Sequence, residues 1–256
     1  MRSLSASLCI ALAGTPVLAP GPALAAELQP LAYTILSDDQ PVGRRDVGIR
    51  YLPQERGEVR ILESWTSLEL VAGGARLSFE QRLGARFGGD RGFASSTRAN
   101  GVLREVQARL GVDGAWCVTV TSGGEANTWI LAGDAVDLTS AELNDRERAL
   151  PLLARIDTLR LLSAETGQVL DGPVTALEPD TIEIGGRPVP VQRFRWTPPE
   201  GAMVLAFDDE GTLLAYDWEA LGRRVGARAG SLPPPRSWGG GPEASVVREA
   251  VEEEGL

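Results

Sequence analysis

The sequence predicts a mainly β protein built on one strongly curved antiparallel sheet, a half-barrel or open barrel, with one or two short helices. Two observations carry this prediction. Runs of alternating apolar and polar residues recur from residue 32 to residue 218, and turn pairs such as Asn100-Gly101 and Gly123-Gly124 separate many of them. Helical periodicity appears only over TSAELNDRERAL and near the C-terminus.

The N-terminal 25 residues read as a signal peptide. Arg2 is followed by a short apolar run and then by Ala23-Leu24-Ala25, a small-x-small pattern that places the cleavage site before Ala26. The apolar run is too short, and too interrupted by Gly and Pro, to span a bilayer. We therefore expect a periplasmic or secreted protein with no transmembrane segment in the mature chain.

The remaining chain divides into two parts. Residues 26–228 carry the strand pattern and form one β-rich domain, within which Thr139 and Glu142 predict the capping box of a helix of about ten residues, near residues 140 to 150, lying across a face or mouth of the sheet. Residues 229–256 are a Gly/Pro-rich linker and an acidic tail. The tail is either a short amphipathic helix or a disordered segment.

Composition narrows the possible chemistry. The chain has 25 basic and 35 acidic residues and a net charge of −10, which argues against nucleic acid as a partner. It contains no His, and every basic residue is Arg. Without His or Lys there is no Ser-His-Asp triad, no histidine-bound zinc and no Schiff-base lysine. Most hydrolase and transferase mechanisms are excluded, and the sequence favours a protein that is not an enzyme.

Other candidate sites have structural explanations. Asp38-Asp39 and Asp208-Asp209 fit turns better than paired catalytic carboxylates or a calcium loop. The Gly pairs match no nucleotide-binding motif. Cys117 is expected to be a structural residue. We predict no catalytic residue, no metal site and no cofactor. The arginine doublets at 44–45 and 223–224 could bind an anion, although solvated surface is the simpler reading.

Aromatic residues provide the one candidate binding site. The stretch RFRWTPPEGAMVLAFDDEGTLLAYDW is predicted to form neighbouring antiparallel strands, which would bring Phe194, Trp196, Tyr216 and Trp218 together. These rings would line a concave apolar face that holds a ligand, or they would simply form core.

A pattern-level resemblance points in the same direction. YTILSDDQPVG, IEIGGRPVPVQRFRW and FDDEGTLLAYDW resemble segments of exported bacterial proteins of unknown function whose fold is similar to lipoprotein carriers of the LolA and LolB kind. The resemblance implies a strongly curved antiparallel sheet with helices in its concavity, and it transfers no functional residue.

Three functions remain open. The first is an exported, non-catalytic binding or envelope-assembly protein that holds a lipid or other apolar or amphiphilic ligand on the concave face. The second is a structural or interaction module that recruits an envelope protein by an edge strand or the acidic tail. The third, ranked last, is a carboxylate-based glycan hydrolase, which needs two acids from separate strands on either side of one bond.

Overall fold

The computed structural model describes residues 31–54, 57–88 and 91–230. The expected signal peptide, residues 1–25, lies outside these residues, as does the expected linker and tail beyond residue 230.

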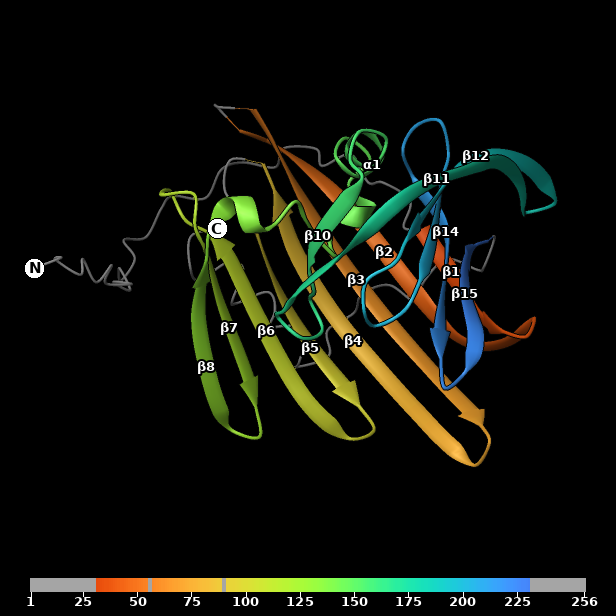
Figure 1. Ribbon diagram of the computed structural model, residues 1–256, viewed down its shortest axis with the longest axis horizontal. Helices are drawn as coiled ribbons and strands as arrows, with labels where there is room; N and C mark the ends of the chain where they lie inside the picture. Colours follow the sequence, from red (N-terminus) through yellow and green to blue (C-terminus); the bar gives the residue numbers. More distant parts are fainter. Residues whose placement is uncertain (1–30, 55–56, 89–90, 231–256) are drawn as a thin grey trace, which may run out of the picture.

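One continuous sheet accounts for most of the described chain (Figure 1). It has 15 strands in the order β8-β7-β6-β5-β4-β3-β2-β1-β15-β14-β13-β12-β11-β10-β9. The strands are β1 Leu31–Ser37, β2 Gln40–Gln54, β3 Gly57–Ala72, β4 Ala75–Phe87, β5 Gly92–Ala99, β6 Val102–Leu110, β7 Trp116–Ser122, β8 Glu125–Leu131, β9 Leu138–Thr139, β10 Thr158–Leu162, β11 Val169–Ile184, β12 Arg187–Trp196, β13 Met203–Phe207, β14 Leu213–Ala220 and β15 Arg223–Ala229. The predicted class, a curved antiparallel sheet with few helices, is confirmed.

Local sequence explains most of the hairpins. Asp38 and Asp39 (φ 48° and 62°) turn the chain from β1 to β2, and Asn100 and Gly101 (φ 50° and 83°) turn it from β5 to β6. Two consecutive positive φ values define the turn that matches strand twist, and Asn, Asp and Gly tolerate it best. The turn interpretation of Asp38-Asp39 is confirmed.

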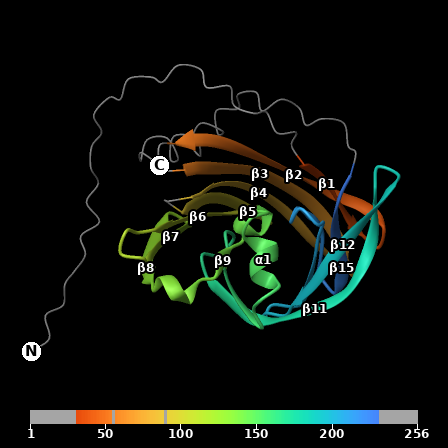
Figure 2. The ribbon, with the colours of Figure 1, turned by 90° about the horizontal axis from the view of Figure 1, so that it is seen from above.

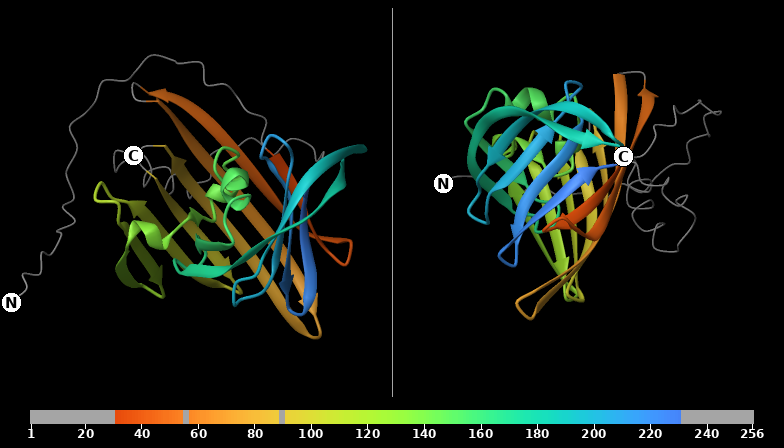
Figure 3. Two further views of the ribbon diagram at one scale, coloured as in Figure 1. Left: turned by 45° about the horizontal axis from the view of Figure 1, so that its top comes forward. Right: turned by 90° about the vertical axis from the view of Figure 1, so that its right-hand side faces the viewer.

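Two strand pairings join segments that are not neighbours in the sequence. β1 pairs with β15, with Tyr33 opposite Ala229, so the two ends of the described chain meet in the middle of the sheet. At its far end, β9 pairs with β10 in parallel. The sheet has two free ends, β8 and β9, and it curls without closing (Figure 3).

The two ends of the curled sheet overlap. The turn between β10 and β11 reaches the concave face of β5 to β7, where the Ser95 hydroxyl donates to the carbonyl oxygen of Ala164. A Cβ added to Gly167, in the same turn, would lie 2.5 Å from Val120 Cγ2 and 3.3 Å from Val106 Cγ1. The β10–β11 end of the sheet is therefore packed inside the curve of the other end.

The helical segment differs from the prediction. The expected ten-residue helix is two short pieces, the 3₁₀ helix η2 Glu142–Asn144 and the helix α1 Ala149–Leu153; another 3₁₀ turn, η1 Gly133–Ala135, precedes them. Asp145 interrupts the helix with an extended backbone (ψ 99°), and its carboxylate accepts from the backbone N–H of Glu147. Such local side-chain bonds compete with helix formation. Seen from above, α1 lies inside the curve of the sheet (Figure 2).

Two apolar clusters stabilise this arrangement. The larger one joins the concave faces of β1 to β7 and β15, with Ile35, Leu62 and Val106 fully buried. The smaller one packs Leu143, Ala149 and Leu153 of the helical segment against Phe194 and Phe207 of the sheet. The helical segment is thus an integral part of the core.

Candidate functional site

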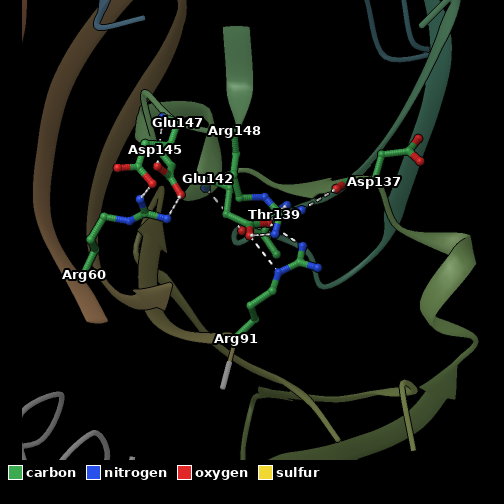
Figure 4. Close-up of polar contacts among 8 residues, drawn as sticks. All are labelled: Arg60, Arg91, Asp137, Thr139, Glu142, Asp145, Glu147 and Arg148. Atoms are coloured by element: carbon green, nitrogen blue, oxygen red, sulfur yellow. Dashed lines mark hydrogen bonds and ion pairs between the residues drawn. The ribbon is translucent and has the colours of Figure 1, made fainter. Parts of the chain in front are cut away.

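Residues 138–153, which we call the inner segment, are bound to the concave side of the sheet by buried ion pairs (Figure 4). The carboxylate of Glu142 accepts two hydrogen bonds from Arg91, at 2.8 and 2.9 Å, and the side chain of Glu142 is 1% exposed. The predicted capping box is confirmed, because the N–H of Thr139 donates to Glu142 Oε2 at 2.8 Å. One carboxylate therefore orders the start of η2 and fixes it to the residue just before β5.

A second pair fixes the middle of the inner segment. Arg60 on β3 lies 3.1 Å from Asp145 and also contacts Glu147. Burial raises the pKa of Asp145, and the charge of Arg60 offsets only part of that effect. An Asp held this way depends strongly on its arginine.

Aromatic rings and one arginine form a cluster further along the concave face. Tyr216 and Trp218 on β14 are stacked, with ring centres 5.3 Å apart, and Tyr33 meets Tyr216 edge-on at 6.1 Å. The guanidinium of Arg45 lies 5.3 Å from the Tyr216 ring centre and 5.6 Å from that of Tyr33. A contact of this kind between a guanidinium and an aromatic ring is worth about 1–2 kcal/mol when water is partly excluded. Burial alone would lower the pKa of Arg45, but the two tyrosines raise it, so the group stays charged.

The strand register extends this cluster into a row of polar side chains across six strands. Residues directly opposite each other in neighbouring strands share a face. The row consists of Tyr33, Arg45, Thr66, Gln81, Thr97 and Arg104. Arg104 lies two residues from Val106, which packs against the β10–β11 turn, so this row faces the concave interior.

One acid faces the polar row. Glu165, in the β10–β11 turn, interacts through charge with Arg45 and Arg104. Its side chain is accessible to water, yet burial is the main cause that raises its pKa. Both observations fit a carboxylate that water reaches but that protein surrounds.

The four predicted ligand-binding residues fall into two groups. Phe194 and Trp196 are 4% and 1% exposed and pack in the smaller apolar cluster, where Trp196 Nε1 donates to the Leu159 carbonyl oxygen at 3.3 Å. Tyr216 and Trp218 are half-buried and keep accessible surface. Tyr216 and Trp218 are therefore accessible on this face, whereas Phe194 and Trp196 belong to the core.

Several site residues were not foreseen from the sequence. The sequence predicts a solvated surface position for the doublet that contains Arg45, whereas its place opposite Tyr33 puts Arg45 inside. Arg104 carried a usable signal, because it stands on the apolar face of its strand beside Val106. No pattern in the sequence marks Glu165 as a site residue, because a Glu before Thr-Gly is ordinary in a turn.

An open groove of about 810 Å³ lies over β12 to β14, and Trp218 is among the residues that line it. Arg193, Arg195 and Arg224 line it, and two of them are paired, Arg193 with Asp180 and Arg224 with Asp217, both at 2.7 Å. Arg223 pairs with Asp38 at 2.7 Å. These side chains form a partly neutralised surface.

Other expectations concern isolated residues. Asp208 stabilises its own turn, since its carboxylate accepts from the Thr212 N–H at 2.7 Å. Cys117 is half-buried in β7. Within residues 31–54, 57–88 and 91–230, no group of three potential metal ligands comes together. No helix in these ranges has the length and apolar character needed to cross a membrane.

Comparison with known proteins supports the fold. The chain is similar to the crystal structure of a beta-barrel-like protein of the domain of unknown function DUF1849 from Brucella abortus, with a TM-score of 0.53 and 14% sequence identity, over 80% of this chain and 97% of that one. At this identity the likeness concerns the fold alone. No family model and no curated protein matches the chain.

Proposed function

We propose that the mature chain is an exported, non-catalytic binding or envelope-assembly protein that holds an apolar or amphiphilic ligand in the concave interior. One observation carries the proposal. On a face whose apolar side chains are mostly buried, Tyr216 and Trp218 keep accessible surface and lie beside the charged Arg45. Apolar walls with a few convergent polar groups are typical of small-molecule sites. The pattern-level resemblance to exported bacterial proteins of unknown function, whose fold is similar to lipoprotein carriers of the LolA and LolB kind, agrees with this use of a curved sheet.

Native mass spectrometry of the chain purified from the periplasm tests the proposal. We expect an added mass of several hundred daltons that is lost on denaturation. N-terminal sequencing of the same sample would show whether residues 1–25 are removed. A chain that carries no ligand, and that binds no alkyl amphiphile when one is added, would refute the proposal.

Two substitutions separate binding from stability. Trp218→Ala should weaken ligand binding while the fold is retained, because Trp218 is half-buried. Trp65→Ala is the matched control, since Trp65 is also half-buried but lies on the opposite face of β3, next to the inward-facing Thr66. Equal binding by both variants would exclude Trp218 as a contact residue.

A partner-recruiting module is the second candidate, and the free edge of β8 favours it. β8 pairs only with β7 among the described strands, it contains no Pro, and Ile130 on it is 63% exposed. Such an edge can accept an added strand. Ile130→Lys should reduce partner recovery in a pull-down if the edge is used. Removal of residues 230–256 tests the tail in the same assay.

A further inference from the structure

We propose that Arg45 and Arg104 form a binding site for the anionic head of an amphiphile, and that Glu165 balances their charge when no ligand is bound. This inference rests on the proposed binding function and adds the class of ligand to it. The head would be a carboxylate or a phosphate on an alkyl chain. Both offer the oxygen geometry that guanidinium groups bind best.

The two arginines lack direct acidic partners. Among the described residues, Arg45 donates one long hydrogen bond, 3.3 Å, to the amide oxygen of Asn144 and also interacts with the side chains of Tyr33 and Tyr216. Arg104 makes no hydrogen bond or ion pair within the described chain. Both side chains are half-buried on the concave face. Charges in such places are usually paired, because partial removal from water is costly. Two guanidinium groups on one polar row can therefore still accept an anion.

Glu165 is an acid whose charge acts on both arginines, although burial raises the pKa of its carboxyl. Its carboxylate interacts electrostatically with both arginines, yet it forms no direct ion pair with either within the described chain. With Glu165 ionised, the three groups carry a net charge of +1. An anion that approaches closer than Glu165 would gain direct hydrogen bonds that the protein itself does not supply.

The position of Glu165 is fixed by its turn. Ser163 Oγ accepts from the N–H groups of Glu165 and Thr166, at 3.1 and 3.2 Å, and the Ala164 N–H donates to Ser140 Oγ at 2.9 Å. Because these bonds hold the backbone, the carboxylate cannot approach the arginines by movement of the whole turn. The separation between the Glu165 carboxylate and the two guanidinium groups is therefore set by the fold.

Apolar side chains lie next to the proposed head site. Trp218 stacks on Tyr216, which itself lies beside Arg45. On the next row of the sheet, Leu68 and Phe79 are opposite each other on β3 and β4, and Phe79 keeps accessible surface. An alkyl chain attached to an anion at Arg45 can lie against either surface. The head and the tail of an amphiphile thus both find complementary groups.

The test compares four ligands that share a decyl chain and differ in the head. Decanoate, decyl phosphate, decanol and decyltrimethylammonium are titrated by calorimetry below their micelle concentrations into ligand-free protein. We expect both anions to bind at least tenfold more tightly than decanol and the cation. Tighter binding of decyl phosphate favours a phospholipid-type head, and tighter binding of decanoate favours a fatty acid. Equal affinities for all four ligands would refute the inference but leave the proposed function intact. If none of the four binds, the proposed function itself fails.

Variants assign the effect to the three groups. Arg45→Gln and Arg104→Gln should each lower affinity for the anions about tenfold and leave decanol binding unchanged. Glu165→Gln should raise affinity for the anions several-fold, which a merely structural role would not produce. Arg98→Gln, at an exposed position next to Thr97 on β5, is the control and should change nothing. The inference is overturned if the anion affinities of Arg104→Gln and Glu165→Gln equal that of Arg98→Gln.

Discussion

Loss of Arg91 should destabilise the protein far more than loss of a surface arginine. Glu142 is 1% exposed, and Arg91 supplies both of its closest side-chain donors. Removing one partner of a buried pair typically costs about 3–5 kcal/mol, because the other charge is left buried. Arg148 stays 3.5 Å from Glu142 and compensates in part, so we expect about 3 kcal/mol for Arg91→Met. This free-energy cost includes the lost contact of the Arg91 guanidinium with the Trp116 ring, whose centre lies 5.2 Å away.

Urea unfolding followed by tryptophan fluorescence measures this effect. The control is Arg76→Met, which breaks the exposed pair of Arg76 with Glu69 and should cost about 0.5 kcal/mol or less. The double variant Arg91→Met/Glu142→Gln removes the stranded charge and should recover about 2 kcal/mol relative to Arg91→Met. The reasoning is wrong if Arg91→Met costs no more than Arg76→Met, or if the double variant is no more stable than the single one.

Three further outcomes are expected. Trp196→Ala should cost about 3–5 kcal/mol in urea unfolding because it empties a core site, and a loss below 1 kcal/mol would contradict the burial of that ring. Gly167→Ala should be clearly less stable than Gly101→Ala: both residues have positive φ, but only at Gly167 would a new Cβ meet other side chains, so equal stabilities would argue against the packing of the β10–β11 turn. Because the folded state raises the pKa of Glu165, the stability linked to its protonation is complete below the unfolded pKa and is lost as the pH rises through the folded pKa. Glu165→Gln should therefore be more stable than the natural chain at pH 7. The difference should shrink as the pH falls through the raised folded pKa and be lost below the unfolded pKa, about 4.3, and a difference that does not change with pH would contradict the raised pKa.

The position of β12 in the sheet shows how much of strand order local sequence can predict. Pro188 and Pro190 predict an edge strand, since neither has a backbone N–H to donate. In the structure β12 is interior, yet its half with these prolines pairs only with β11, while residues 193–196 pair with both β11 and β13. The local inference holds for the half-strand and fails for the whole strand, because β12 is longer than one of its neighbours.

The sequence by itself determined the class of fold, the turns and the limits on chemistry. Alternation of side chains and the φ preferences of Asn, Asp and Gly act over a few residues, so hairpins such as Asn100-Gly101 can be read directly. The capping box of Thr139 and Glu142 is equally local. The absence of His and Lys is a property of composition and needs no structure.

Tertiary structure alone decided which side chains share the concave interior. The pairing of β1 with β15, and the packing of the β10–β11 turn against β5 to β7, join residues far apart in the sequence, such as Ser95 and Ala164, which are 69 positions apart. No local preference encodes such contacts, because they depend on how the whole sheet curls. That curvature turned Arg45 from one half of a surface doublet into an interior charge and brought Glu165 opposite it. It also buried Phe194 and Trp196 beneath the inner segment while leaving Tyr216 and Trp218 accessible.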